Sequence, residues 1–91
     1  MTELERELDR ILTRLAALPE RHQVHGADLT HTAAQRIRDL TPDTQAPRVV
    51  PRIGTHAAGA QLRVICAEFA YSGGHETEAA QILADLRRAL P

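Results

Sequence analysis

Aromatic residues are almost absent from this sequence, which contains Phe69 and Tyr71 and no Trp. The chain therefore has little with which to stack on the bases of a single-stranded nucleic acid. The large β-branched residues that favour strands are also few, with five Ile and four Val against eleven Leu and fifteen Ala. Since Leu and Ala are strong helix formers, the composition predicts an all-α domain.

Lysine is absent as well, and cysteine occurs once. All eleven cationic residues are Arg, and the formal net charge of −1 produces no overall field that would attract nucleic acid or an anionic membrane. Cys66 alone can form neither an internal disulfide nor a cysteine-rich zinc site. The sequence shows no secretory signal pattern and no stretch near the ~20 apolar residues of a membrane span. We therefore expect a cytoplasmic protein with no membrane contact.

Apolar residues recur at helical spacing in four segments of the chain. Residues 1–91 are therefore expected to form a single helical domain, a small four-helix bundle. The first helix begins with Thr2 and Glu5 in the pattern of a capping box and ends before Pro19. The other three helices are expected at about 28–40, 55–71 and 75–90.

The segment 41–54, TPDTQAPRVVPRIG, contains three prolines. Because proline and the residue before it disfavour helix, we predict a proline-rich extended crossover between the second and third helices. Val49, Val50 and Ile53 are unusual for a flexible linker. We expect the crossover to run extended across the bundle and to bury all three side chains.

The first helix carries the most regular apolar pattern in the chain. Five residues follow one another at spacings of 4, 3, 4 and 3, which makes an a/d seam over two heptads. Four amphipathic helices in so short a chain present more apolar surface than one small core buries, so this seam could pair with a second copy or with a partner's helix. The alternative is that the seam packs within the single chain. The predicted protein-interaction residues are Leu4, Leu8, Ile11, Leu15 and Leu18.

Three of the five histidines lie within the segment RHQVHGADLTH. His22, His25 and His31, with an aspartate between them, supply ligands of the kind that zinc or nickel accepts. Their spacing matches no established metal motif such as H-E-x-x-H. We interpret the segment as a polar connector between the first two helices, and a His-based metal site is the alternative.

The third predicted helix is apolar over much of its circumference, because Val64, Cys66 and Ala67 widen its stripe. Such a helix is usually the central one of a bundle. The apolar neighbours of Cys66 are typical of a buried small residue and not of a reactive thiol. No nucleophile elbow, phosphate loop or concave carboxylate pair is present, so we predict a protein that is not an enzyme and has no catalytic residue and no cofactor.

These observations favour a non-enzymatic protein–protein interaction or accessory module, one that forms a homodimer or binds a partner protein. The first alternative is a small DNA-binding regulator. The low net charge and the absence of helix-turn-helix spacing oppose it. The second alternative is a metal-binding protein that uses the three clustered histidines. The basic region that a DNA-binding regulator would use consists of Arg36, Arg38, Arg48 and Arg52.

Overall fold

The computed structural model describes residues 1–42, 45 and 47–91, and those residues form α-helices and one short 3-10 turn without any strand. The predicted all-α fold and four-helix architecture are therefore confirmed. Residues 43–44 and 46 of the predicted crossover lie outside the described part of the chain. The elements are α1 (Glu3–Ala17), α2 (Glu20–Leu40), η1 (Thr55–Ala57), α3 (Ala58–Tyr71) and α4 (Glu76–Ala89).

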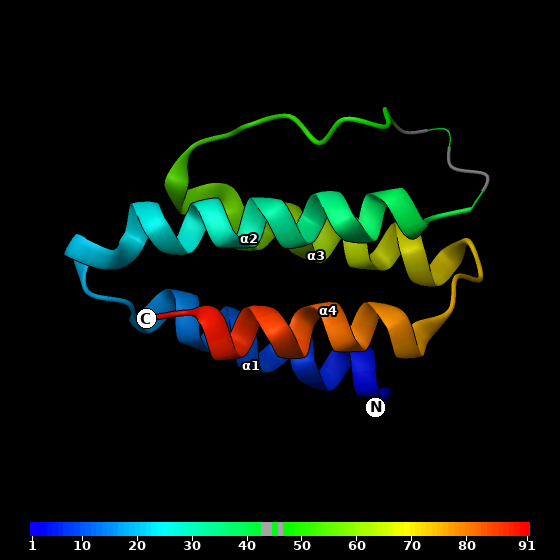
Figure 1. The fold of residues 1–91 in the computed structure, drawn as a ribbon, viewed down its shortest axis with the longest axis horizontal. Coiled ribbons are helices and arrows are strands. Elements are labelled where there is room, and N and C mark those ends of the chain that lie inside the picture. Colours follow the sequence, from blue (N-terminus) through cyan, green and yellow to red (C-terminus); the bar gives the residue numbers. More distant parts are fainter. Residues whose placement is uncertain (43–44, 46) are drawn as a thin grey trace.

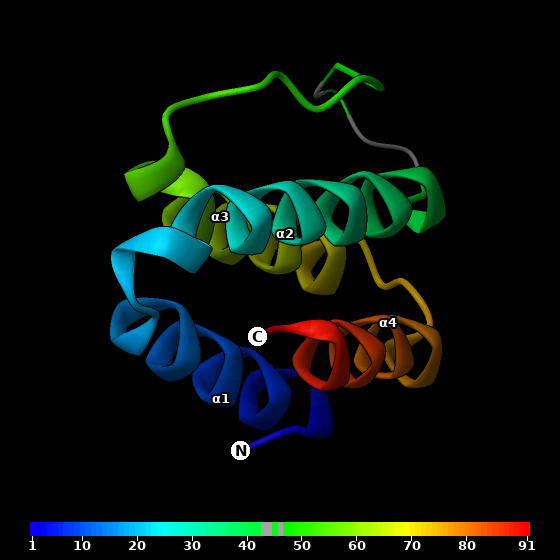
Figure 2. The ribbon, with the colours of Figure 1, turned by 60° about the vertical axis from the view of Figure 1, so that its left-hand side comes forward.

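The helices form two layers, one of α1 and α4 and one of α2 and α3 (Figures 1 and 2). α1 and α4 run in the same direction, because Leu4 lies beside Glu76 at one end and Arg14 beside Pro91 at the other. α2 and α3 also run in the same direction, opposite to the first pair (Figure 1). Each parallel pair packs closely, and α2 also packs on α4, whereas α1 and α3 make much less contact.

The core lies between the two layers and draws on every α-helix. Its most deeply buried large side chains are almost free of solvent contact. A continuous cluster of buried apolar residues connects them across both layers. They are Ile11 from α1, Ile37 from α2, Leu62 and Phe69 from α3, and Leu83 from α4.

The predicted connector at residues 21–31 is wrong, because this segment lies inside α2. α2 begins at Glu20 instead of near Asp28, and only Leu18 and Pro19 separate it from α1. Gly26, which precedes the helix expected from about residue 28, is buried inside α2. A Cβ atom at Gly26 would lie 2.6 Å from Cδ1 of Leu18, so the glycine permits close packing here and does not end a helix.

In its described residues 47–54 the crossover has the predicted extended course and returns the chain along the length of the bundle (Figure 1). Only part of its predicted burial is correct. Val50 is 2% exposed, whereas Val49 is 74% exposed and Ile53 is 47% exposed. An extended chain alternates its side chains between two sides, so neighbouring Val49 and Val50 cannot both face the bundle.

Side-chain amides hold the crossover against the helices. On α2, Gln35 accepts from the backbone N–H of Val50 at 2.8 Å and donates to the carbonyl of Arg48 at 2.9 Å. From α3, Gln61 donates to the carbonyl of Pro51 at 2.8 Å. The backbone of residues 48–51 thereby finds partners although it belongs to no regular element.

The turn between α3 and α4 is closed by a Schellman motif. Gly73 has a positive φ of 76° and donates to Ala70, while the N–H of Gly74 donates to the carbonyl of Phe69. A Cβ atom at Gly74 would lie 2.5 Å from Cζ of Phe69, whose ring is buried and cannot move aside.

We expect Gly74→Ala to lower the free energy of unfolding by about 1–3 kcal/mol, because the added methyl group overlaps the Phe69 ring. Gly54→Ala is the matched control, since nothing lies within 4 Å of a Cβ atom there. Urea unfolding followed by circular dichroism compares the two variants. Equal stability of Gly74→Ala and the wild type would contradict the predicted overlap.

Candidate interaction surface

The structure places the predicted α1 seam mainly inside the single chain. Leu4, Ile11 and Leu18 are buried, and Ile11 is 0% exposed. Leu8 and Leu15 pack against the same core but keep part of their surface in solvent. The intramolecular alternative therefore accounts for three of the five residues. An interface role for the exposed parts of Leu8 and Leu15 stays a prediction.

The seam can be tested at its most buried position. An interface seam predicts that Ile11→Asp leaves a folded monomer. We expect it to unfold the chain, because an unpaired carboxylate in the core costs about 4 kcal/mol or more, most of the stability of a small domain. Thr13→Asp, on the exposed side of α1, is the control and stays folded. Circular dichroism and thermal melting measure both; a cooperative melt for Ile11→Asp would show that the core tolerates the charge.

α3 is not the central helix that its sequence suggested, because its outward side is uncovered in the chain. Val64 is 55% exposed and Tyr71 is 94% exposed, and Ala60 and Ala67 are exposed between them. These four residues follow one another at spacings of 4, 3 and 4. We call Ala60, Val64, Ala67 and Tyr71 the α3 face. The sequence shows this spacing, but the width of the apolar surface on the helix led us to expect that the whole helix is buried.

The outward sides of the other three helices are different in character, because they carry charged residues of both signs. Within α3, Arg63 is exposed beside the α3 face, and Glu68 is tied to Arg38 of α2 on the far flank. An exposed apolar stripe on one helix of a charged bundle is typical of a contact surface. The exposed charges on these helices are Glu3, Glu5, Arg6, Asp9, Arg10 and Arg14 on α1, Glu20, Arg21, Asp28, Arg36 and Asp39 on α2, and Glu78, Asp85 and Arg88 on α4.

The α3 face continues into a groove between α1 and α3, the pair of neighbouring helices in least contact. One hollow of about 470 Å³ has Leu12, Leu15 and Gly59 in its lining. A second hollow of about 450 Å³ has Leu8 in its lining. The two hollows follow one another along α1 and α3 and share Arg63 in their linings, and we call them together the α1–α3 groove.

Two opposite charges face this groove from its two walls. Glu5 of α1 and Arg63 of α3 both line the second hollow, and both side chains are exposed. The structure records no ion pair or side-chain hydrogen bond for either group within the described residues. The groove therefore offers the Arg63 cation and the Glu5 anion to a partner, whereas Glu76, which also lines the second hollow, accepts from the backbone N–H of Leu4.

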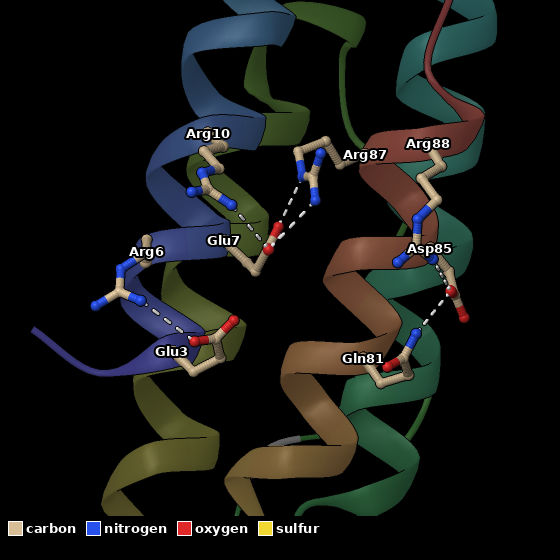
Figure 3. Close-up of polar contacts among 8 residues, drawn as sticks. All are labelled: Glu3, Arg6, Glu7, Arg10, Gln81, Asp85, Arg87 and Arg88. Atoms are coloured by element: carbon tan, nitrogen blue, oxygen red, sulfur yellow. Dashed lines mark hydrogen bonds and ion pairs between the residues drawn. The ribbon is translucent and has the colours of Figure 1, made fainter.

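The buried charge at the α1–α4 contact has a structural role. Glu7 is 4% exposed and accepts from Arg87 of α4 at 2.8 Å and from Arg10 at 3.2 Å (Figure 3). The hydrogen bond and charge of Arg87, with a smaller effect of Arg10, hold the pKa of Glu7 below its ordinary value although burial opposes this. Both oxygens of the carboxylate therefore accept hydrogen bonds from arginines of the chain itself.

The lowered pKa of Glu7 makes the stability depend on pH. The ion pair contributes fully above the ordinary pKa of 4.5, and the contribution is lost as the pH falls through the lowered value. We expect Glu7→Gln to be less stable than the wild type by about 1–2 kcal/mol at pH 7, with the difference shrinking below pH 4.5. Glu3→Gln, which alters an exposed pair on the same helix, is the control. Urea unfolding across pH 3–7 measures both, and a pH-independent difference would contradict this role.

The four arginines of the predicted DNA-binding region do not form one open basic patch. Arg38 is buried and pairs with Glu68 at 2.7 Å. Arg52 is exposed but pairs with Asp28. Arg36 and Arg48 are exposed to solvent. Two of the four charges are therefore matched by carboxylates of the chain, which weakens the electrostatic attraction to phosphate on which nucleic acid binding depends.

The clustered histidines are spread along α2. His31 donates from Nε2 to the carbonyl of Val50 at 2.9 Å and so helps to hold the crossover. His25 is exposed, three residues after His22 on the helix. Among the residues that the structure describes, no group of three or more His, Cys, Asp or Glu side chains lies close enough to hold a metal ion. Cys66 is buried, and desolvation raises the pKa of its thiol to about 12.

Comparison of the chain with known protein families, curated proteins and solved structures found no match. Across the described residues, none of the helices is long and apolar enough to cross a membrane.

Proposed function

We propose that this protein is a non-enzymatic interaction module that self-associates, and that its contact surface is the α3 face with the adjoining α1–α3 groove. The observation that carries the proposal is the α3 face itself. It places Val64 and Tyr71 in solvent on a helix whose exposed side has Arg63 as its charged residue.

The pattern of the α3 face suits a helix as the partner. Spacings of 4, 3 and 4 keep the four residues on one line along α3, as the core positions of paired helices require. Ala60 and Ala67 are small, so a second helix can approach closely between Val64 and Tyr71. Covering the two larger side chains removes apolar surface from water, at about 25 cal/mol per Å².

The α1 seam contributes to this surface through its edge. Leu4, Ile11 and Leu18 are already occupied by the core. The exposed parts of Leu8 and Leu15 border the same groove as α3, so a partner on the α3 face also covers them. This retains the predicted role of the seam in association for Leu8 and Leu15 while assigning the larger share to α3.

We expect the wild type to be a dimer that dissociates on dilution and Val64→Glu to be a folded monomer, because the new carboxylate lies in the middle of the contact. Val24→Glu is the matched control: Val24 is 64% exposed on α2, outside the proposed surface. Sedimentation equilibrium over a concentration series measures association, and circular dichroism confirms that both variants are folded.

Three results would contradict the proposal. The first is a wild type that stays monomeric at every concentration. The second is a Val64→Glu variant that associates as the wild type does. The third is an equal loss of association in Val24→Glu, which would show that added charge anywhere on the surface opposes association.

A further inference from the structure

We propose that two copies pair through antiparallel α3 helices, about a twofold axis that passes midway between Val64 and Ala67. The inference rests on the proposed self-association and adds its orientation and register. It follows from the sizes of the residues on the α3 face and from the positions of the two charges that face the groove.

The antiparallel register matches large residues with small ones. With the axis between Val64 and Ala67, Ala60 of one copy lies opposite Tyr71 of the other, and Val64 lies opposite Ala67. In a parallel pair each residue would meet its own copy. The two Tyr71 rings would then crowd one end, while the Ala60 pair at the other end and the Ala67 pair between Val64 and Tyr71 would be loosely packed. Both departures from close packing are unfavourable.

The same register brings opposite charges together. α1 runs antiparallel to α3, so that Gly59 lies beside Leu12 while Glu5 shares a hollow with Ala70. The twofold axis is perpendicular to both α3 helices. The flank of α3 that carries Arg63 and faces α1 therefore lies on the same side of the dimer in both copies. Arg63 therefore comes opposite the level between Ala67 and Ala70 of the second copy, where the Glu5 of that copy faces the groove.

The proposed contact is small. The α3 face runs from Ala60 to Tyr71, which makes it about 16 Å long at 1.5 Å per residue. Stable interfaces generally bury about 800 Å² on each partner, and one helix face with a groove edge supplies less than this. We therefore expect a dimer that dissociates on dilution, and association should be measured over a concentration series that extends above about 100 micromolar.

Disulfide trapping tests the register. Ala60→Cys and Tyr71→Cys, made separately and distinguished by mass, are mixed, oxidised and analysed by non-reducing mass spectrometry. The antiparallel register predicts mainly the mixed 60–71 disulfide. Identical positions would be separated by 11 residues, or about 16 Å along the helices, which is too far for a disulfide. Oxidised wild type controls for Cys66, which is buried.

The outcomes separate the inference from the proposed function. Mainly 60–60 and 71–71 disulfides would overturn the antiparallel register and leave self-association through α3 intact. Cross-linking no greater than in the wild type, together with a wild type that dimerises, would place the contact elsewhere and overturn both. A wild type that is monomeric at all concentrations would overturn the proposed function itself.

A charge exchange tests the ion pairs. Arg63→Glu and Glu5→Arg should each weaken dimerisation, by about fivefold for exposed pairs turned repulsive, and the double variant should recover most of the loss. Arg88→Glu, which alters an exposed charge on α4, is the control and leaves dimerisation unchanged. Since Glu5 lies in the first turn of α1, its replacement can also change the stability of the fold. Thermal melting of each variant separates such a change in stability from a change in dimerisation. A double variant weaker than either single one would overturn the pairing of Arg63 with Glu5.

Discussion

The return of the chain over the length of the bundle determines how the four helices are arranged. α2 and α3 can lie parallel only because the crossover carries the chain back to the end at which α2 began (Figure 1). Gln35 is central to this course, since its one side chain bonds the backbone on both sides of Val49. A crossover without such partners would leave backbone groups unpaired beside the helices, which folded proteins avoid.

The parallel pairing has a consequence for packing. α1 lies closely against α4, and α3 lies closely against α2, so the remaining contact between α1 and α3 is the most open side of the bundle. Leu8 and Leu12 are therefore buried only in part, although they belong to the most amphipathic helix. The α3 face is the continuation of that open side, and it exposes two of the large apolar side chains, Val64 and Tyr71, along one line of a helix.

The positions of the ion pairs follow the same difference between the closely packed sides of the bundle and its open side. Glu7 is buried at the closely packed α1–α4 contact and is matched by Arg87 and Arg10. Arg38 and Glu68 similarly join α2 to α3. Where two helices pack closely, the buried charges thus form ion pairs within the chain. At the open α1–α3 side, Glu5 and Arg63 face a shared hollow and remain available to a second copy.

The sequence by itself determined the number and type of the helices and where most of them end. These features depend on the backbone preferences of single residues and not on tertiary contacts. Pro19 ends α1, Pro42 follows α2, and the glycines after Ser72 close α3. Only the tertiary structure decided that α2 begins at Glu20 and that α3 leaves one apolar side open. Gly26 ends or continues a helix according to what packs on it, and here Leu18 does. The spacing of Leu62, Ile65 and Phe69 already favoured Ile65 as a core residue. Whether Val64 on the other side is covered depends on the neighbouring helices, and none of them packs on it.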